Sequence, residues 1–220
     1  GATVKWFTPP MFRLDRWIDL EFNFYTGNRT IYAQTFVKSD GDKEVQLRFG
    51  VSGSIKVYVN DHEVISEEED ANNDYDNYNV KLKLSSGWNR ILVKVGEHEA
   101  NSCNFLMRIT DDNGNPISLE SKAEPQTYTK KKVDYTAVRP EHIVYLEQVY
   151  EKNPDNLLIG YVLSEAYLAA DKKYLTRKTL NQIEKKVPNS AFVKSQLLEV
   201  YNREDNETGV NKLIEWFKVN

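Results

Sequence analysis

The densest group of side chains that could do chemistry lies between residues 66 and 78. This stretch has no basic residue and contains the carboxylates of Glu67, Glu68, Glu69, Asp70, Asp74 and Asp76. Carboxylates combined with asparagine oxygens suit a hard cation such as calcium. The Asp-x-Asp-x-Asp-Gly spacing of a calcium loop is absent, so the pattern favours a solvated, mobile acidic loop and leaves a cation site as the alternative.

The sequence offers no recognisable catalytic motif. His62, His98 and His142 are scattered, and none has metal-ligand spacing with another. Cys103, the one cysteine, lies in an apolar strand pattern, which indicates a buried thiol rather than a nucleophile. Glycine-rich dinucleotide motifs and the Gly-x-Ser-x-Gly motif are also absent. We therefore expect a protein that is not an enzyme, with no catalytic residue, no metal and no cofactor.

The composition limits the kinds of partner that the chain can be expected to bind. The 220 residues have a formal net charge of -4 and a pI of about 5.6, so no basic excess is available for phosphates and nucleic acid is not an expected partner. No apolar run approaches the roughly 20 residues that span a membrane. The chain begins Gly1-Ala2-Thr3. We interpret Gly1 as a cloning remnant and the chain as a processed or truncated piece of a longer protein.

The chain changes character near residue 120. Before this point, short runs alternate between apolar and polar residues or are β-branched, and Gly, Asn and Asp separate them. The runs cover residues 31–37, 44–49, 54–59, 63–65, 78–84, 90–95 and 104–110. Alternation places every second side chain on one face of a sheet. Many short strands with turn residues between them predict an antiparallel β-sandwich over residues 1–120.

The first 30 residues are unusually aromatic for a solvated tail. Their large apolar residues are Trp6, Phe7, Phe12, Trp17, Ile18, Leu20, Phe22, Phe24 and Tyr25. We expect this segment to pack along the sandwich, with an exposed stacking surface as the alternative.

Residues 121–139 have the composition of a linker. They contain Pro125, few apolar residues and the triplet Lys130-Lys131-Lys132. A lysine triplet in such a segment favours a solvated linker over a phosphate-binding patch.

From Pro140 onward the apolar residues recur at spacings of three and four, which predicts helices up to residue 220. Five helices are expected, near residues 143–150, 158–167, 174–186, 191–201 and 209–217. The sequence also contains an internal repeat. Pro154 and Pro188 lie 34 residues apart, and Leu146, Leu180 and Ile214 follow one another at the same spacing.

A 34-residue period with a proline after each second helix resembles the tetratricopeptide repeat. Leu163, Ser164 and Tyr167 stand where that family places a large apolar, a small and an aromatic residue. Ile183, Leu198 and Val210 stand where the family prefers small residues, so looser or shifted packing is expected. The resemblance covers about residues 141–220 and implies tetratricopeptide-like hairpins, which usually present a concave surface to a partner.

Three stretches of the first part, residues 53–61, 84–95 and 105–114, resemble the galactose-binding-like jelly-roll domains that serve as accessory modules of glycoside hydrolases. That family has a strand ending in a turn like Val57-Tyr58-Val59-Asn60-Asp61 and a later strand after a turn like Gly87-Trp88-Asn89. Asp61 replaces the usual glycine, and an Asn-Asp pair still tolerates positive φ. Similar domains stand beside tetratricopeptide-like helices in large exported bacterial proteins, which implies a periplasmic or secreted location.

The resemblance also supplies candidate ligand-binding residues, since some members bind sugars through aromatic side chains on loops. The candidates are Trp88, Tyr75 and Tyr78. An aromatic face matches the C–H face of a pyranose, although a tryptophan in such a turn is more often packed over the sheet edge.

Three functions follow in order of preference. The first is a non-catalytic binding or scaffold protein that positions a protein partner or an adjoining domain of the same polypeptide. The second is a carbohydrate-binding module that uses Trp88. The third is a hydrolase with an interdomain site, which needs two carboxylates, or a histidine with a nucleophile, within about 10 Å of each other.

Overall fold

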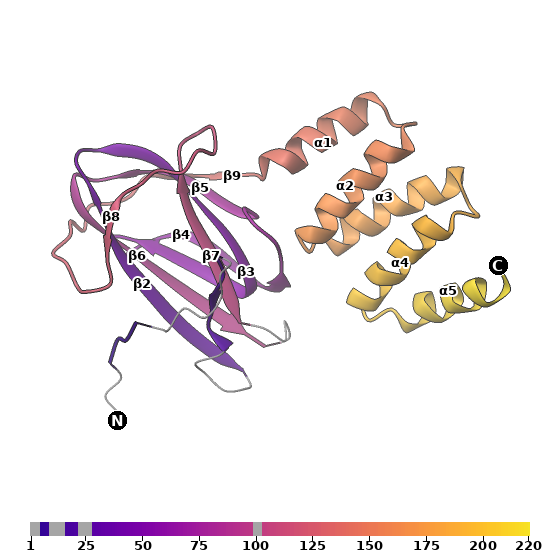
Figure 1. Ribbon diagram of the computed structural model, residues 1–220, viewed down its shortest axis with the longest axis horizontal. Helices are drawn as coiled ribbons and strands as arrows, with labels where there is room; N and C mark the ends of the chain where they lie inside the picture. Colours follow the sequence, from indigo (N-terminus) through magenta and orange to yellow (C-terminus); the bar gives the residue numbers. More distant parts are fainter. Residues whose placement is uncertain (1–4, 9–15, 22–27, 99–102) are drawn as a thin grey trace. The chain divides into compact units, whose positions relative to one another are not determined.

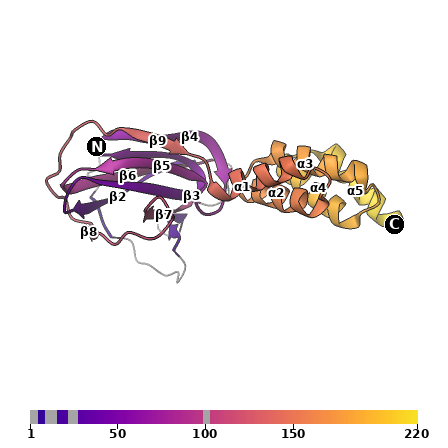
Figure 2. The ribbon, with the colours of Figure 1, turned by 90° about the horizontal axis from the view of Figure 1, so that it is seen from above.

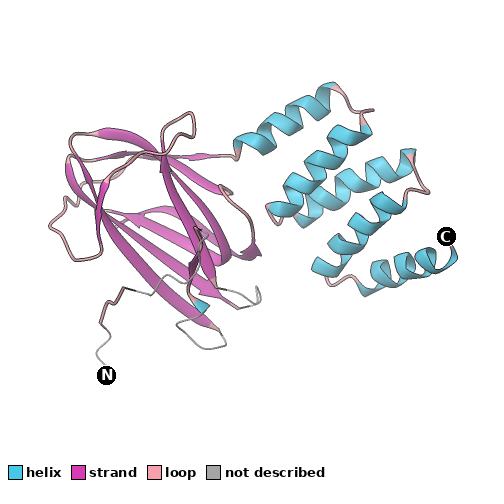
Figure 3. Ribbon diagram, viewed as in Figure 1, coloured by secondary structure: helices cyan, strands magenta, loops and turns pink. Residues whose placement is uncertain are grey.

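The computed structural model describes residues 5–8, 16–21, 28–98 and 103–220. The chain divides into two compact units, Gly1–Arg139 and Pro140–Asn220. In the described residues the first unit is built from strands and the second from helices (Figures 1 and 3). The predicted change from β to α structure is therefore confirmed.

The first unit is a curled antiparallel sheet, a half-barrel (Figure 2). Its described strands are β1 (Ile18–Asp19), β2 (Arg29–Ser39), β3 (Lys43–Val59), β4 (His62–Asn72), β5 (Tyr78–Leu84), β6 (Gly87–Glu97), β7 (Asn104–Thr110), β8 (Glu120–Lys122) and β9 (Tyr135–Val138). Every pair of neighbours is antiparallel.

Strand β3 lies at the centre of the sheet and is bonded along both edges. Its first half pairs with β5 and β7, and its second half pairs with β4 and β6. Gly53 lies where the partners change, with φ of +120°. A Cβ at Gly53 would lie 2.3 Å from the Gly96 carbonyl oxygen, so only glycine fits here.

The turn between β3 and β4 forms as the sequence predicts. Asn60 and Asp61 adopt φ of 51° and 68°, the left-handed conformation of a two-residue hairpin turn. The Asn60 side chain donates to Asn89 Oδ1 at 2.8 Å and accepts from the Arg90 amide at 2.9 Å. These bonds tie the β3–β4 turn to the start of β6.

The aromatic N-terminal segment contributes to the sheet through β1, and Leu20 is buried in the core. Trp6 and Phe7 are exposed. Phe12, Phe22, Phe24 and Tyr25 lie outside the described residues.

The segment that composition marks as a linker, residues 121–139, contains the end of one short strand and the whole of another. Lys122 ends β8, which pairs with β2, and residues 135–138 form β9, which pairs with β5. Val133, between them, is buried in the core. Edge pairing uses backbone hydrogen bonds and needs few apolar side chains, so composition does not reveal it.

The second unit contains five helices in the described chain, in the regions that the sequence predicts. They are α1 (Glu141–Lys152), α2 (Leu157–Ala169), α3 (Lys173–Lys186), α4 (Ala191–Arg203) and α5 (Glu207–Val219). Asn156, Ser190 and Asn206 cap α2, α4 and α5 by accepting from a backbone amide of the first turn. Among the described residues, no helix is long and apolar enough to cross a membrane.

Backbone geometry repeats at the same 34-residue spacing as the sequence. The C-cap residues of α1 and α3 are Asn153 and Val187. Both have φ of -134°, and their ψ angles are 60° and 67°. The residues after the ends of α2 and α4, Asp171 and Asp205, both have φ of 53°. Equivalent positions in the repeat thus adopt equivalent conformations.

Lys194 joins three helices of the second unit. Its ammonium group lies 2.6 Å from Glu184 Oε1 on α3 and 4.9 Å from the ring centre of Trp216 on α5. The Lys194 side chain is only 10% exposed and that of Glu184 30%, so both the ion pair and the cation–π contact are partly shielded from water.

Replacing Lys194 with alanine should therefore destabilise the helical unit by about 1–3 kcal/mol, because Glu184 loses its partner and Trp216 loses its cation. Urea denaturation followed by helical circular dichroism measures this change. Lys178→Ala, on the exposed side of α3, is the matched control and should change stability by less than about 0.5 kcal/mol. Equal midpoints for the two variants would contradict a structural role for Lys194.

Candidate functional site

The three predicted ligand-binding residues do not form one site. Tyr78 begins β5 and Tyr75 precedes it, whereas Trp88 lies just beyond the other end of β5, near the start of β6. Seven residues of strand at about 3.3 Å each separate the two ends by about 20 Å. Trp88 and the tyrosines therefore belong to two separate surfaces.

Trp88 lies near the start of β6, at one end of the sheet, between two lysines. It pairs with Lys38 on β2, and Lys38 pairs with Glu120 on β8. The ammonium groups of Lys38 and Lys122 lie 5.9 Å and 5.2 Å from the indole centre. Glu120 bridges the two lysines at 3.6 Å and 3.7 Å. The half-buried indole is thus engaged by cations of its own sheet, which compete with a ligand for its faces.

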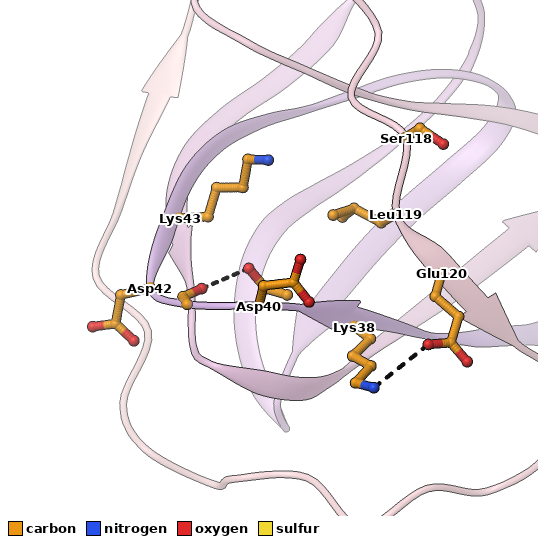
Figure 4. A pocket seen from close by; sticks show the side chains of 9 residues that line it. Lys38, Asp40, Asp42, Lys43, Ser118, Leu119 and Glu120 are labelled. Atoms are coloured by element: carbon orange, nitrogen blue, oxygen red, sulfur yellow. Dashed lines mark hydrogen bonds and ion pairs between the residues drawn. The ribbon is translucent and has the colours of Figure 1, made fainter.

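A polar hollow of about 350 Å³ adjoins this end of the sheet (Figure 4). It is lined by residues 38–43, which include the β2–β3 turn, and by residues 118–120 before and at the start of β8. A hydrogen bond from the Ser86 amide, helped by Lys83, holds the pKa of Asp42 below its ordinary value. The Asp42 carboxylate pairs with Lys83 at 3.3 Å and points away from the hollow, whereas Lys43 points into it (Figure 4).

The second surface is the Tyr75 loop, residues 73–77 between β4 and β5. The Tyr75 side chain is 51% exposed, and its ring centre lies 5.7 Å from that of Trp17. Tyr78 behaves differently, because it is half-buried and packs against the core of the sheet. The loop thus displays an aromatic pair, Tyr75 with Trp17.

Hydrogen bonds fix the Tyr75 loop against β3. The backbone amide of Asn73 donates to the Val51 carbonyl oxygen at 3.1 Å, and that of Asn77 donates to the Phe49 carbonyl oxygen at 2.9 Å. In return, Asn73 Oδ1 accepts from the Val51 amide at 3.1 Å. The exposed ring of Tyr75 is therefore held by a rigid backbone, which lowers the entropy lost when a ligand binds.

Two arginines neutralise Asp76, one of the two carboxylates of this loop. Asp76 accepts from Nε of Arg108 at 3.0 Å and from its Nη2, and Arg48 Nη1 lies 3.7 Å from the same carboxylate. Both arginines lie far from Asp76 in the sequence, which explains why residues 66–78 read as uniformly acidic. Glu67 to Asp70 also lie in strand β4, so the expectation of a mobile acidic loop is wrong for them.

Buried amide groups around the Tyr75 loop retain unused hydrogen-bonding capacity. Among the described residues, Asn73 Nδ2, Asn77 Oδ1 and Asn79 Oδ1 have no hydrogen-bond partner. Asn73 and Asn79 are only 4% and 5% exposed, so an unmet donor or acceptor is costly there. A water molecule enclosed within the loop would satisfy them.

The sequence points to Trp17 only as one of the aromatic residues of the N-terminal segment, for which an exposed stacking surface is the alternative, and it singles out none of these asparagines. Trp17 is remote in sequence from Tyr75, and nothing in the text links the two residues. The asparagines were noted only as possible cation ligands. Within the described part of the chain, no group of three or more His, Cys, Asp or Glu side chains is arranged to hold a metal ion.

Cys103 is a buried thiol, as the sequence predicts. It is 0% exposed, and burial raises the pKa of its thiol to about 11. The thiol therefore stays protonated and is a poor nucleophile at neutral pH.

Comparison with known proteins places the chain only coarsely. No protein-family model and no curated protein matches it. The β-glucosidase from Kluyveromyces marxianus in complex with glucose is 20% identical over 38% of this chain and 11% of that chain, with a TM-score of 0.31. The GH31 alpha-xylosidase from Xanthomonas citri is 12% identical over 55% of this chain and 13% of that chain, with a TM-score of 0.29.

A third solved structure is of a different kind. The anti-sigma factor domain-containing protein from Clostridium clariflavum is 12% identical over 45% of this chain and 34% of that chain, with a TM-score of 0.31. The chain therefore spans about a third or less of the length of each of these proteins. Glycoside hydrolases are among its structural neighbours, at low coverage and low similarity.

A substitution at Gly50 of β3 tests whether the Tyr75 loop packs against this strand. A Cβ at this position would lie 2.4 Å from the Asp74 carbonyl oxygen and 3.0 Å from Cη2 of Trp17. Gly50→Ala should therefore displace the loop and destabilise the β unit by about 1–3 kcal/mol. Chemical denaturation followed by tryptophan fluorescence measures the change.

Gly41→Ala is the matched control for this substitution, because a Cβ at Gly41 meets nothing within 4 Å. This control should leave stability within about 0.5 kcal/mol of the parent. If Gly50→Ala is as stable as Gly41→Ala, the loop does not rest against β3 as described.

Proposed function

We propose that this chain is a non-catalytic binding protein that positions a protein partner or an adjoining domain of the same polypeptide. In this proposal the helical unit is a short tetratricopeptide-like stack, and the β unit is a galactose-binding-like jelly-roll sandwich. The 34-residue period of both sequence and backbone geometry supports the first assignment. The second rests on the resemblance of three stretches of sequence, as does an extracytoplasmic location.

One observation carries the proposal, an exposed apolar surface formed by α2 and α4. We name it the α2–α4 patch and define it as Leu158, Tyr161, Val162 and Phe192. Leu158 and Phe192 are 71% and 59% exposed. Leu158, Tyr161 and Val162 share one face of α2 by their spacing of three and four residues. Tyr161 contacts Phe192 of α4, with ring centres 4.3 Å apart, so the surface is continuous across the two helices.

The patch has the chemistry of an interface for an apolar segment. Burial of a Leu or Phe side chain contributes about 1.5–3 kcal/mol, so two such contacts supply useful affinity. Burial and a hydrogen bond to the neighbouring Glu165 raise the pKa of Tyr161 to about 12, so its hydroxyl is already paired within α2 and its ring is the part that a partner would contact. A large aliphatic or aromatic side chain of a partner would cover Leu158 and Phe192.

Peptides selected by the whole chain from a random library displayed on phage should carry at least one large apolar side chain. Binding of these peptides to the double variant Leu158→Glu with Phe192→Glu should weaken roughly 30-fold or more, because buried apolar anchors dominate interface energy. Titration calorimetry measures the loss.

The matched control is the double variant Tyr145→Glu with Tyr174→Glu. These residues are 65% and 62% exposed and lie on α1 and α3, outside the α2–α4 patch. This variant should bind the peptides like the parent. Equal loss of binding in both double variants, or in neither, argues against the α2–α4 patch.

A specific observation also favours carbohydrate binding as a second candidate function. The Tyr75 loop combines an exposed ring, held rigidly, with buried amide groups that lack partners. A sugar offers a C–H face to such a ring. Trp88 is the weaker candidate, because Lys38 and Lys122 already lie against its indole.

A glycan-array screen separates these surfaces. If sugar binds at the Tyr75 loop, Tyr75→Ala should weaken it by up to roughly tenfold, since aromatic contacts are worth about 0.5–1.5 kcal/mol. Trp88→Ala and Tyr135→Ala should retain binding. Tyr135 is the matched control, because it is 50% exposed and lies on β9. If only Trp88→Ala loses glycan binding, the sugar site lies at Trp88 instead of the Tyr75 loop. If the parent chain binds no glycan, carbohydrate binding is excluded as a function.

A further inference from the structure

The segment between β8 and β9 crosses from one edge of the sheet to another. We name residues 123–134 the strap; they join the two strands labelled in Figure 1. β8 pairs with β2, whereas β9 pairs with β5, and β2 and β5 are not neighbours in the sheet. The strap therefore spans strands that no direct pairing connects.

An aromatic contact anchors the middle of the strap. The ring of Tyr128 lies 5.8 Å from that of Phe36 on β2, and Phe36 is only 2% exposed. Its neighbour Val37 belongs to the core of the sheet. Because successive side chains of a strand point to opposite faces, Phe36 lies on the outer face. A side chain on the outer face is thus buried with the help of Tyr128.

A cluster of donors around Asp61 provides the second anchor. Tyr128 Oη donates to the Asp61 carboxylate at 2.9 Å, and Lys130 Nζ lies 3.1 Å from it. Arg90 Nη1 of β6 donates to the same carboxylate at 2.9 Å. Partial burial raises the pKa of Asp61, but the bonds from Tyr128, Lys130 and Arg90 outweigh this effect and hold the pKa below its ordinary value. Asp61 thus joins the strap to both β6 and the β3–β4 turn.

The strap has little backbone support compared with the sheet. Among the described residues, the backbone of residues 123–134 takes part in no hydrogen bond with another backbone group outside the paired strands. The Lys130 carbonyl oxygen lies 3.4 Å from His62 Nε2, and Val133 is buried at the end next to β9. A segment held by a few side chains opens at a lower free energy than the ladders beneath it.

We propose that the strap is a latch that opens as a unit around Asp61 while the sheet stays folded, so that Phe36, on the outer face of β2, becomes accessible only when it is open. Asp61 sets the balance between the two states, because its carboxylate accepts from both Tyr128 and Lys130. The device controls exposure of an apolar surface without unfolding the unit that carries it.

Trypsin reports the open state directly, because Lys130, Lys131 and Lys132 place its cleavage sites within the strap. Under native conditions, Asp61→Asn should speed cleavage at these lysines roughly tenfold or more, since hydrogen bonds to a charged group are lost. Asparagine tolerates the left-handed conformation that Asp61 adopts, so the turn itself is preserved.

Asp134→Asn is the matched control. It removes one carboxylate close to the same cleavage sites, and Asp134 is 93% exposed and 3.9 Å from Lys132. This variant should be cleaved at the parent rate. Tyr128→Phe, which keeps the ring on Phe36 and removes the hydroxyl, should give an intermediate rate.

The parent chain provides a test that is independent of any variant. Raising the salt concentration should speed cleavage of the parent and have a smaller effect on Asp61→Asn, because ions screen the charged anchor. The same cleavage rate in Asp61→Asn and the parent would overturn the proposal. The proposal would also be overturned if the cleavage rate rose with urea as steeply as unfolding of the whole β unit does, because cleavage would then require global unfolding.

Discussion

The β unit depends on the hydrogen bonds along the two edges of β3. This 17-residue strand exchanges partners halfway along its length, from β5 and β7 to β4 and β6. Because four strands pair with it, their register is set by one segment, and a shift of one residue would turn core side chains toward solvent. Leu47, Phe49, Val51 and Val57 on this strand are fully buried. Gly53 permits the close approach to Gly96 where the partners change.

The helical unit is organised in a different way. Each helix packs mainly against its neighbours in sequence, and the core consists of two small clusters of apolar residues. A stack of this kind gains stability from contacts between adjacent hairpins, with charged links such as Lys194 with Glu184. Since each helix covers only its neighbours, apolar side chains such as Leu158 and Phe192 remain at the surface and are available to a partner.

Local patterns predict much of this structure, and long-range contacts account for what they miss. Alternation and the Asn60-Asp61 pair indicate the strands and the β3–β4 turn, and the 34-residue period reappears in backbone angles. The pairing of Asp76 with Arg108 joins residues 32 positions apart, so composition alone marks Asp76 as part of an acidic stretch. Likewise, β8 and β9 are held by edge pairing in a segment that has the composition of a linker.

The central claim is that a partner occupies the α2–α4 patch. Hydrogen–deuterium exchange of the whole chain, with and without a peptide selected on it, tests this claim most directly. Slower exchange confined to α2 and α4 is the predicted result. Slower exchange at the Tyr75 loop, with no change in α2 and α4, would contradict the claim and give the binding role to the β unit.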